Sequence, residues 1–305
     1  MDILELNKVS KSFGELNVIQ ELSFSVPGNT VFGFIGKNGS GKTTTMKMIL
    51  GFLAQDGGEI HVCGEKVTYG NSKTNRYIGY LPDVPEFYNY LSPKEYLKLC
   101  GEVTGLKREL IESRSKELLS MVGLENANRK IRGFSRGMKQ RLGIAQALLN
   151  EPKLLICDEP TSALDPVGRK EILDILSLAK EKTTIVFSTH ILSDVERICD
   201  RIGILDQGSL KLQGSVEEVK SNYRKDTLQL EVAPKVNMQQ LEESLKRLSF
   251  VSQAKATGNK LDIQLTSADK FGPEILAFLV KEKVPLIRYE IMEPSLENVF
   301  LEVVG

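Results

Sequence analysis

Residues 36–43 have the sequence Gly-Lys-Asn-Gly-Ser-Gly-Lys-Thr. This stretch is the starting point for predicting the strands and helices around it. It matches the pattern G-x-x-x-x-G-K-[ST], which is typical of loops that bind phosphate groups. The apolar run at 31–35 predicts a buried strand before the loop, and apolar residues at helical spacing over 44–53 predict a helix after it. Strand, glycine-rich loop and helix therefore stand in the order that this motif requires.

The residue types in this loop suit the phosphates of a nucleotide. Glycines let backbone N–H groups point toward phosphate oxygens, and the N-terminus of the following helix adds partial positive charge. Lys42 would reach the β- and γ-phosphates, and the hydroxyl of Thr43 would bind Mg²⁺. The alternative is a glycine-rich turn with a chance lysine, which the matching flanks disfavour. The residues expected to bind the nucleotide here are Gly36, Lys37, Asn38, Gly39, Ser40, Gly41, Lys42, Thr43 and Thr44.

The bulk composition argues against several functional classes. The 305 residues include 40 basic and 40 acidic side chains, so no strong basic field supports binding to nucleic acid or to an anionic membrane. With only two histidines, a multi-histidine metal site cannot be built. The four cysteines show no C-x-x-C pairing, which predicts reduced, mostly buried thiols in a cytosolic protein. No apolar run approaches the ~20 residues that span a bilayer, and the N-terminus does not resemble a signal peptide. We therefore expect any membrane association to come through a partner.

Apolar patterning predicts an α/β core that is interrupted by a helical segment. Short strands are expected before and after the loop, at 4–6, 22–26, 60–62 and 77–81, with a turn at 55–59. Helical spacing dominates 93–149, where Ser92, Pro93 and Glu95 form a helix-start signal. Strand patterns return at 154–157 and 183–188 around a helix at 168–180, which indicates a parallel sheet with both faces covered. The prediction is one domain over 1–220 with a helical subdomain at about 85–150.

A second, smaller domain is expected at 224–305, after a polar joint at 221–226. Its patterns follow the order β-α-β-β-α-β, which is typical of a ferredoxin-like α+β domain. A last helix over 295–303 would bury Leu296, Val299 and Phe300. We expect this domain to serve as a docking or dimer-stabilising module without an active site.

Two carboxylates follow the apolar strand at 154–157. Asp158 and Glu159 would lie at the carboxyl edge of the sheet, where open α/β sheets bind their ligands. Asp158 would hold Mg²⁺, and Glu159 would orient or deprotonate an attacking water. The alternative is a strand that simply ends in exposed acids, which is common but less favourable with a phosphate loop upstream.

A second anion site is suggested by the segment 133–141, Gly-Phe-Ser-Arg-Gly-Met-Lys-Gln-Arg. Ser135 would cap a helix at 142–149, so its hydroxyl and the following N–H groups could meet phosphate oxygens. One nucleotide does not need two phosphate sites from one chain, but two facing chains could each close the other's site. Taken alone, this segment is better explained as an ordinary helix cap.

Taken together, these motifs resemble the ATP-binding subunits of ABC transporters over about residues 2–215. The matching positions, in chain order, are Phe13 for adenine stacking, residues 36–43 for Walker A, Ser135 and Gly137 in the signature, Asp158 and Glu159 in Walker B, 162–165 for the D-loop, and His190 for the switch histidine. The resemblance implies a P-loop ATPase fold and an ATP-dependent homodimer or heterodimer with ATP between the two chains. It further implies that Glu159 is the catalytic base, that His190 contacts the γ-phosphate, and that ATP and Mg²⁺ are the cofactors.

Four positions depart from the family pattern. Arg136 and Met138 replace a glycine and a glutamine of the signature, and Phe13 replaces the common tyrosine. Asp83 stands where a glutamine is usual; an aspartate could bind Mg²⁺ but, as an anion, could not donate a hydrogen bond. We therefore include Asp83 with Thr43 and Asp158 as expected metal ligands.

The subgroup resemblance is to ATPases of ABC-2-type exporters, through residues 78–83, the signature, and the C-terminal stretch 293–301. It implies hydrolysis of ATP that energises export through separate membrane permease subunits, with the chain cytoplasmic and peripheral on the inner face of the cell membrane. The alternative is a soluble ABC-type ATPase that acts on ribosomes or DNA. The single cassette, the absence of sustained heptads and the zero net charge disfavour that alternative, so no nucleic-acid partner is expected.

Overall fold

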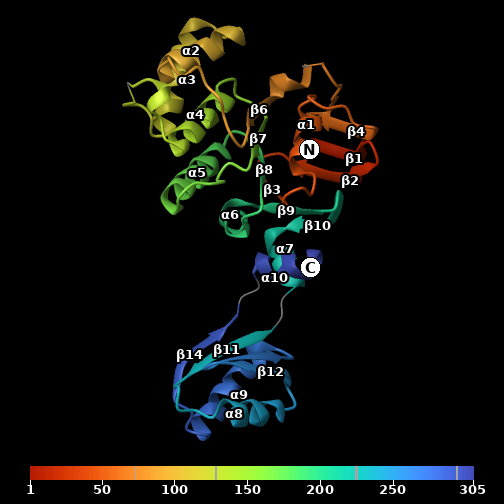
Figure 1. The fold of residues 1–305 in the computed structure, drawn as a ribbon, viewed down its shortest axis with the longest axis vertical. Coiled ribbons are helices and arrows are strands. Elements are labelled where there is room, and N and C mark those ends of the chain that lie inside the picture. The colour runs from red at the N-terminus through yellow and green to blue at the C-terminus, as the bar shows by residue number, and fades with distance from the viewer. Residues whose placement is uncertain (72, 128, 224–225, 293–294) are drawn as a thin grey trace. The chain divides into compact units, whose positions relative to one another are not determined.

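The computed structural model describes residues 1–71, 73–127, 129–223, 226–292 and 295–305. Backbone contacts divide the chain into two compact units. The first comprises Met1–Val216 together with Phe300–Gly305, and the second comprises Glu217–Val299. Two sequence expectations fall partly outside the described residues: the joint at 221–226 includes 224–225, and the stretch 293–301 includes 293–294. Figure 1 shows the elements of each unit.

A six-stranded sheet forms the centre of the first unit (Figure 1). Its strands, in spatial order, are β10 (Ser209–Ser215), β9 (Arg201–Asp206), β3 (Val31–Ile35), β8 (Thr184–Thr189), β7 (Leu154–Asp158) and β6 (Ile78–Leu81). All neighbours are parallel except the β9–β10 pair. The strands β3, β7 and β8 are buried along their whole length, which explains their nearly continuous apolar sequence. The predicted parallel sheet is confirmed, although β9 and β10 were not anticipated.

A second sheet is antiparallel and has the order β2-β1-β4-β5. Its strands are β1 (Asp2–Phe13), β2 (Leu16–Pro27), β4 (Gly57–Val62) and β5 (Glu65–Lys66). One hydrophobic core joins this sheet, the central sheet and α1 (Lys42–Ile49). The expectation of short strands was wrong for β1 and β2, whose 12 residues each continue through several register shifts. The expected turn at 55–59 was also misplaced, because β4 already begins at Gly57.

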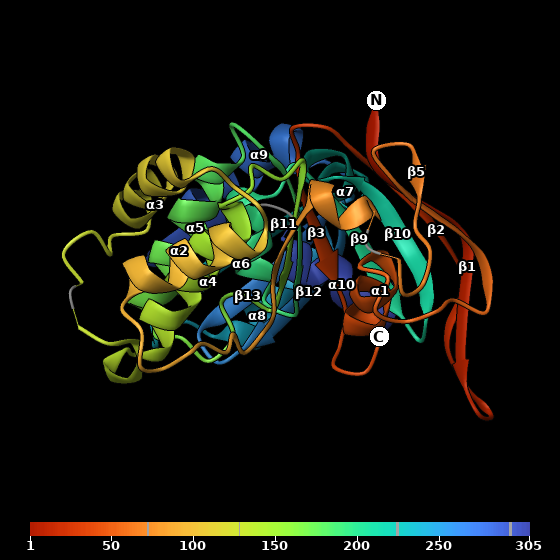
Figure 2. The same cartoon turned by 90° about the horizontal axis from the view of Figure 1, so that it is seen from above.

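The helical subdomain packs beside the central sheet. It contains α2 (Pro93–Val103), α3 (Arg108–Met121) and α4 (Arg136–Leu148). A short 3₁₀ turn at Ile131–Gly133 lies between α3 and α4, and another at Lys73–Tyr77 precedes β6. In Figure 2 these three helices gather on the same side as α5 (Pro166–Ala179). Ser135 caps α4, as predicted, but this helix begins directly at Arg136 rather than at residue 142. The helix α6 (Leu192–Ile198) follows β8, and α7 (Val216–Asn222) begins at the boundary between the two units.

The second unit has the predicted ferredoxin-like order. Its elements are β11 (Thr227–Val232), α8 (Met238–Lys246), β12 (Val251–Thr257), β13 (Lys260–Leu265), α9 (Ala268–Lys281) and β14 (Leu286–Ile291). The spatial order is β12-β13-β11-β14 with antiparallel neighbours, and both helices share one core with the sheet. The last helix, α10 (Leu296–Val304), buries Leu296 and Val299 as expected, while Phe300 is only half-buried.

None of the described helices combines the length and the apolar character that a membrane crossing requires.

The cysteines are free thiols: Cys157 is buried, and Cys63, Cys100 and Cys199 are half-buried. Burial raises the pKa of Cys157 and of Cys199, so both thiols stay protonated at neutral pH. The sequence led us to expect mostly buried thiols, but only Cys157 is fully buried among the four.

The start of α2 generates the first testable prediction. The Glu95 carboxylate accepts hydrogen bonds from the Ser92 backbone N–H, the Ser92 hydroxyl and the Lys130 ammonium group. These contacts lower the pKa of Glu95 from 4.5 to about 2, and the two bonds from Ser92 have the largest effect. A lowered folded-state pKa stabilises the fold above pH 4.5, and this stabilisation is lost as the pH falls toward 2. We expect Glu95→Gln to lower the urea midpoint at pH 7, and the difference from the wild type to shrink between pH 4.5 and pH 2.

The control is Glu102→Gln on the same helix, where the carboxylate lies 3.7 Å from Lys98 Nζ on an exposed surface. Such pairs contribute little to stability, so this variant should resemble the wild type at both pH values. A constant difference between Glu95→Gln and the wild type across the acid range would contradict the prediction.

Candidate functional site

The loop between β3 and α1 has a backbone that only glycine allows at several positions. Gly39 and Gly41 have φ angles of 82° and 109°, in the region that side chains rarely adopt. A Cβ atom on Gly36 would lie 2.3 Å from the Ser40 hydroxyl oxygen and 2.5 Å from the Leu205 carbonyl oxygen. Gly41 also precedes α1 without offering a side-chain cap, which leaves the first N–H groups of the helix for another acceptor.

A cavity of about 380 Å³ lies against this loop. It is lined by Val18, Asn38, Gly39, Gly41, Lys42, Thr43, Thr44, Asp83 and Glu159. Most of the expected phosphate-binding residues therefore meet at one place, together with a carboxylate from the end of β7. The size and the N–H-rich wall of the cavity suit a polyphosphate group.

The ammonium group of Lys42 is held by three oxygen atoms. It donates to the Gly36 carbonyl at 2.7 Å and to the Lys37 carbonyl at 3.3 Å, and its Nζ lies 3.3 Å from Glu159 Oε1. The side chains of Lys42 and Glu159 are only 6% and 14% exposed, so water screens this ion pair weakly. A phosphate that approaches Lys42 must therefore compete with Glu159 for the ammonium group.

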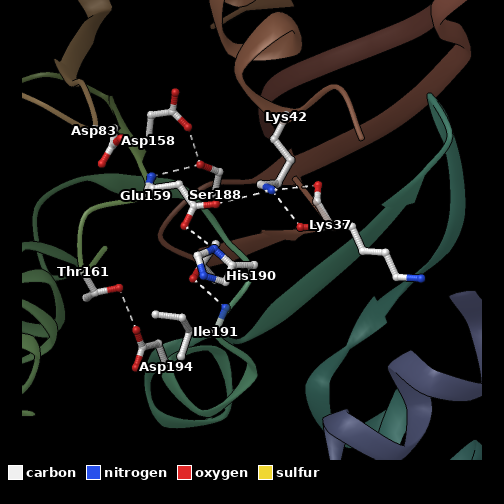
Figure 3. Close-up of polar contacts among 12 residues, drawn as sticks. Lys37, Lys42, Asp83, Asp158, Glu159, Thr161, Ser188, His190, Ile191 and Asp194 are labelled. Carbon is white, nitrogen blue, oxygen red and sulfur yellow. Dashed lines mark hydrogen bonds and ion pairs between the residues drawn. The ribbon is translucent and has the colours of Figure 1, made fainter. Parts of the chain in front are cut away.

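The ends of β7 and β8 lie next to each other in parallel register, with Asp158 opposite Ser188 (Figure 3). The Ser188 hydroxyl donates to Asp158 Oδ1 at 2.6 Å and accepts from the Glu159 N–H at 3.0 Å. This single hydroxyl orients both carboxylate residues. Ser188 was not among the expected site residues; its position at the end of the strand before His190 was the available signal.

His190 completes the group around Glu159. Its Nδ1 lies 2.9 Å from Glu159 Oε2, while the other carboxylate oxygen faces Lys42 (Figure 3). The imidazole side chain is 47% exposed, so it can reach a ligand in front of the sheet edge. Glu159 itself has φ 48°, an uncommon conformation for a residue other than glycine, and such strain often marks a functional site.

A magnesium ion would find only part of its ligands in the chain. Among the described residues, no cluster of three or more His, Cys, Asp or Glu side chains could hold a metal. Mg²⁺ is typically bound by one or two protein oxygens, together with substrate phosphates and water. The Thr43 hydroxyl at the cavity and the buried Asp158 carboxylate at the end of β7 fit that requirement.

Asp83 has a partner that the sequence did not reveal. Its Oδ1 lies 3.2 Å from the Arg136 guanidinium, and its carbonyl accepts from Gln140 at 2.7 Å. Asp83 lines both the loop cavity and a second cavity of about 540 Å³ that also contains Arg136. Its role as a metal ligand stays a prediction, and Arg136 competes with any metal for its carboxylate.

In the part of the chain that the structure describes, six expected nucleotide-binding residues do not line the loop cavity. Gly36, Lys37 and Ser40 belong to the loop itself, whereas Phe13, Ser135 and Gly137 lie on other segments. Phe13 has a half-exposed ring, with Lys11 Nζ 5.4 Å from the ring centroid. Ser135 and Gly137 lie at the start of α4, where the Ser135 hydroxyl accepts from the Met138 N–H at 3.2 Å. A role for Ser135 and Gly137 in phosphate binding would therefore require a nucleotide from another chain.

A glycine-rich loop at a helix start, with an acidic pair on the adjoining strand, defines the class of P-loop nucleoside triphosphatases. Comparisons with known proteins narrow this class. The ABC transporter family matches residues 19–162, and the C-terminal domain of DrrA1-3-like ATP-binding proteins matches residues 214–304.

Similar proteins match the chain over most of its length. The ABC transporter ATP-binding protein YxlF of Bacillus subtilis is 36% identical over 99% of both chains. The linearmycin resistance ATP-binding protein LnrL of the same organism is 33% identical over 99% of this chain and 98% of its own. The bacitracin transport ATP-binding protein BcrA of Bacillus licheniformis is 40% identical over 73% of each chain.

Solved structures agree with this relationship. An ATP-binding subunit of an ABC transporter is 34% identical, with a TM-score of 0.66 over 72% of this chain and 93% of its own. The cbiO1 protein of Clostridium perfringens, part of the ABC transporter complex cbiONQ, is 28% identical, with a TM-score of 0.67 over 72% of this chain and 91% of its own. The chain belongs to the family of ABC transporter ATP-binding proteins. It is an ATP-binding subunit, and the alternative class of ribosome- or DNA-directed ATPases is not favoured.

The ion pair of Lys42 with Glu159 generates the second prediction. Glu159→Gln removes the negative charge that holds the ammonium group, so Lys42 becomes free to bind phosphate. We expect the affinity for a non-hydrolysable ATP analogue to rise about fivefold, which corresponds to ~1 kcal/mol for one charged contact. Isothermal titration calorimetry of the purified chain measures this change without any contribution from hydrolysis.

The control is the same substitution in a Lys42→Ala background, where the gain should vanish if it acts through Lys42. A gain of equal size in that background would mean that Glu159 merely repels the phosphates, and the prediction would be wrong.

Proposed function

We propose that this chain hydrolyses ATP with Mg²⁺ in an ATP-dependent dimer, and that it thereby energises export through separate membrane permease subunits. The observation that carries the proposal is the position of Glu159, whose two carboxylate oxygens lie 3.3 Å from Lys42 Nζ and 2.9 Å from His190 Nδ1. A carboxylate so placed can accept a proton from a water molecule in front of the phosphate held by Lys42.

Each group at the site has a distinct task in this proposal. The loop N–H groups and Lys42 bind the β- and γ-phosphates. Thr43 and Asp158 would hold Mg²⁺, which would supply positive charge against the phosphates. Glu159 takes the proton of the attacking water while the water oxygen bonds to the γ-phosphorus and the bond to the β-phosphate oxygen breaks. His190 holds Glu159 on one side and contacts the γ-phosphate on the other. The products are ADP and inorganic phosphate.

A second chain supplies the rest of the site. Ser135 and Gly137 lie away from the loop cavity of their own chain, so we place them on the nucleotide of a facing chain. The partner can be a second copy or another ATP-binding subunit, since one intact set of motifs serves either. Dimer closure then depends on ATP, and hydrolysis reopens the dimer.

The permease is proposed to dock at the cavity beside Asp83, which is lined by Val84, Pro85, Glu86, Phe87, Asn89, Phe134, Arg136 and Lys139. Val84, Tyr88 and Tyr90 expose 62%, 55% and 68% of their surface near this cavity. Exposed aromatic rings of this kind are typical of protein interfaces. The chain would then lie in the cytoplasm on the inner face of the cell membrane. The names of LnrL and BcrA, which refer to linearmycin resistance and bacitracin transport, support an exporter.

The third prediction tests the proposed chemistry. Glu159→Gln should lower kcat for ATP hydrolysis by about 10²–10⁴-fold, the range expected for loss of a general base. The Glu159→Gln variant should still bind ATP and should accumulate as an ATP-bound dimer in size-exclusion chromatography.

Lys42→Ala should instead lose tight ATP binding. Undiminished turnover in Glu159→Gln would remove Glu159 from the role of base.

The fourth prediction concerns the partner. Pull-down of the tagged chain from native membranes in mild detergent should recover a polytopic membrane protein at about one-to-one stoichiometry. Tyr88→Ala with Tyr90→Ala should reduce the recovery, because the aromatic contact at the interface is lost. Tyr69→Ala is the matched control, because the Tyr69 side chain is 62% exposed, between the values of Tyr88 and Tyr90. This variant should leave the recovery unchanged. Recovery of ribosomal or DNA-bound partners alone would contradict the transporter proposal.

A further inference from the structure

A buried carboxylate behind the catalytic group belongs to none of the motifs described above. Asp194, in the first turn of α6, is only 2% exposed. It accepts a hydrogen bond from the Thr161 hydroxyl at 2.7 Å, and its other oxygen lies 2.6 Å from the Arg169 guanidinium. A buried charge is stable only when it is paired and hydrogen-bonded, and both oxygens of Asp194 meet that condition.

The three partners come from three different segments of the chain. Thr161 follows β7 in the loop that begins with Glu159, Arg169 lies in the first turn of α5, and Asp194 follows His190 by four residues. Figure 3 shows Thr161 and Asp194 joined by a hydrogen bond at the lower left of the pair of Glu159 and His190. One carboxylate thus links the segment that carries Glu159 to the segment that carries His190.

The segment around Thr161 needs such an anchor. Glu159 and Ala163, two residues before and two residues after Thr161, have φ angles of 48° and 52°. This conformation is unfavourable for residues other than glycine, and it persists only where the surroundings hold it. Thr161 is completely buried, and its hydroxyl bond to Asp194 lies at the centre of the strained segment.

The His190 segment is tied down at the same place. The Ile191 N–H donates to the Thr189 hydroxyl at 2.9 Å, and the Asp194 N–H donates to the Ile191 carbonyl at 3.2 Å. The turn that presents His190 therefore ends at Asp194. Movement of Asp194 would shift this turn relative to Glu159.

We propose that Asp194 is a positioning residue that acts through Thr161 and Arg169 to set the contact between Glu159 and His190. Asp194 is not among the described residues that line the loop cavity. Its consequence for hydrolysis rests on the proposed function, whereas its effect on the geometry of Glu159 and His190 does not. A first test therefore reads that geometry directly.

The first test uses the ring nitrogen signals of histidine in NMR spectra of the ¹⁵N-histidine-labelled chain. The chain has two histidines, so His61 in β4 serves as an internal reference for His190. Thr161→Val keeps the shape of the side chain but removes the hydroxyl, and Thr161→Ser keeps the hydroxyl. We expect Thr161→Val and Glu159→Gln to shift the His190 signals, Thr161→Ser to leave them in place, and His61 to stay unchanged throughout.

The matched control is Thr183→Val. Thr183 is also buried, and its hydroxyl donates to the Pro152 carbonyl at 2.8 Å just before β8, at the end of that strand opposite His190. This variant loses a comparable hydrogen bond and should leave the His190 signals where they are. Unmoved His190 signals in Thr161→Val, or an equal shift in Thr183→Val, would overturn the inference, whatever the activity of the chain.

The second test separates positioning from binding. Thr161→Val should lower kcat for ATP hydrolysis about tenfold, because small misplacements of reacting groups cost rate steeply. Its affinity for a non-hydrolysable ATP analogue should stay within about twofold of the wild type, since the phosphate loop is untouched. Thr161→Ser should restore kcat. If Thr161→Val has the kcat of the wild type, the inference is overturned and the ATPase proposal stays intact. If the wild type itself does not hydrolyse ATP, that result counts against the ATPase proposal only.

Discussion

The carboxylate of Glu159, held between the Lys42 ammonium and the His190 imidazole, is the interaction on which the site depends. It exists because β3 and β7 both pair with β8 in parallel register, which brings three carboxyl ends to one edge. The buried apolar strands hold this edge rigid, and the Ser188 hydroxyl joins the two carboxylate residues across it. The hydrophobic core thus provides the rigid support that a charged group of this kind requires.

Two departures from the family pattern meet in the structure. Asp83 and Arg136 each replace the residue that is usual in the family, and they are 53 positions apart in the sequence. In the fold they form an ion pair at 3.2 Å. Both side chains are nearly half-exposed, and ion pairs at such positions contribute little to stability. The pair is therefore weak enough to exchange partners, and it links the signature segment to the cavity where we place the permease.

Local pattern was sufficient for some elements and insufficient for others. The strand β3, the phosphate loop and the βαββαβ order of the second unit were predicted, because each depends on turn residues and apolar spacing within a few positions. The strands β1 and β2 were predicted too short, since pairing across bulges extended them beyond their alternating patterns. The start of α4 was placed six residues too late, because its first turn carries polar residues that give no apolar period.

The sequence by itself determined the class of protein, the glycine-rich loop before α1, and the acid pair and the histidine that follow two neighbouring strands. These follow from residue types at fixed short spacings, where backbone geometry leaves few alternatives. Only the tertiary structure decided which oxygen of Glu159 meets Lys42, that Ser188 joins the acids, and that Asp194 binds Thr161. These contacts join residues about 30 or more positions apart, and their geometry depends on strand register and packing, which no local pattern records.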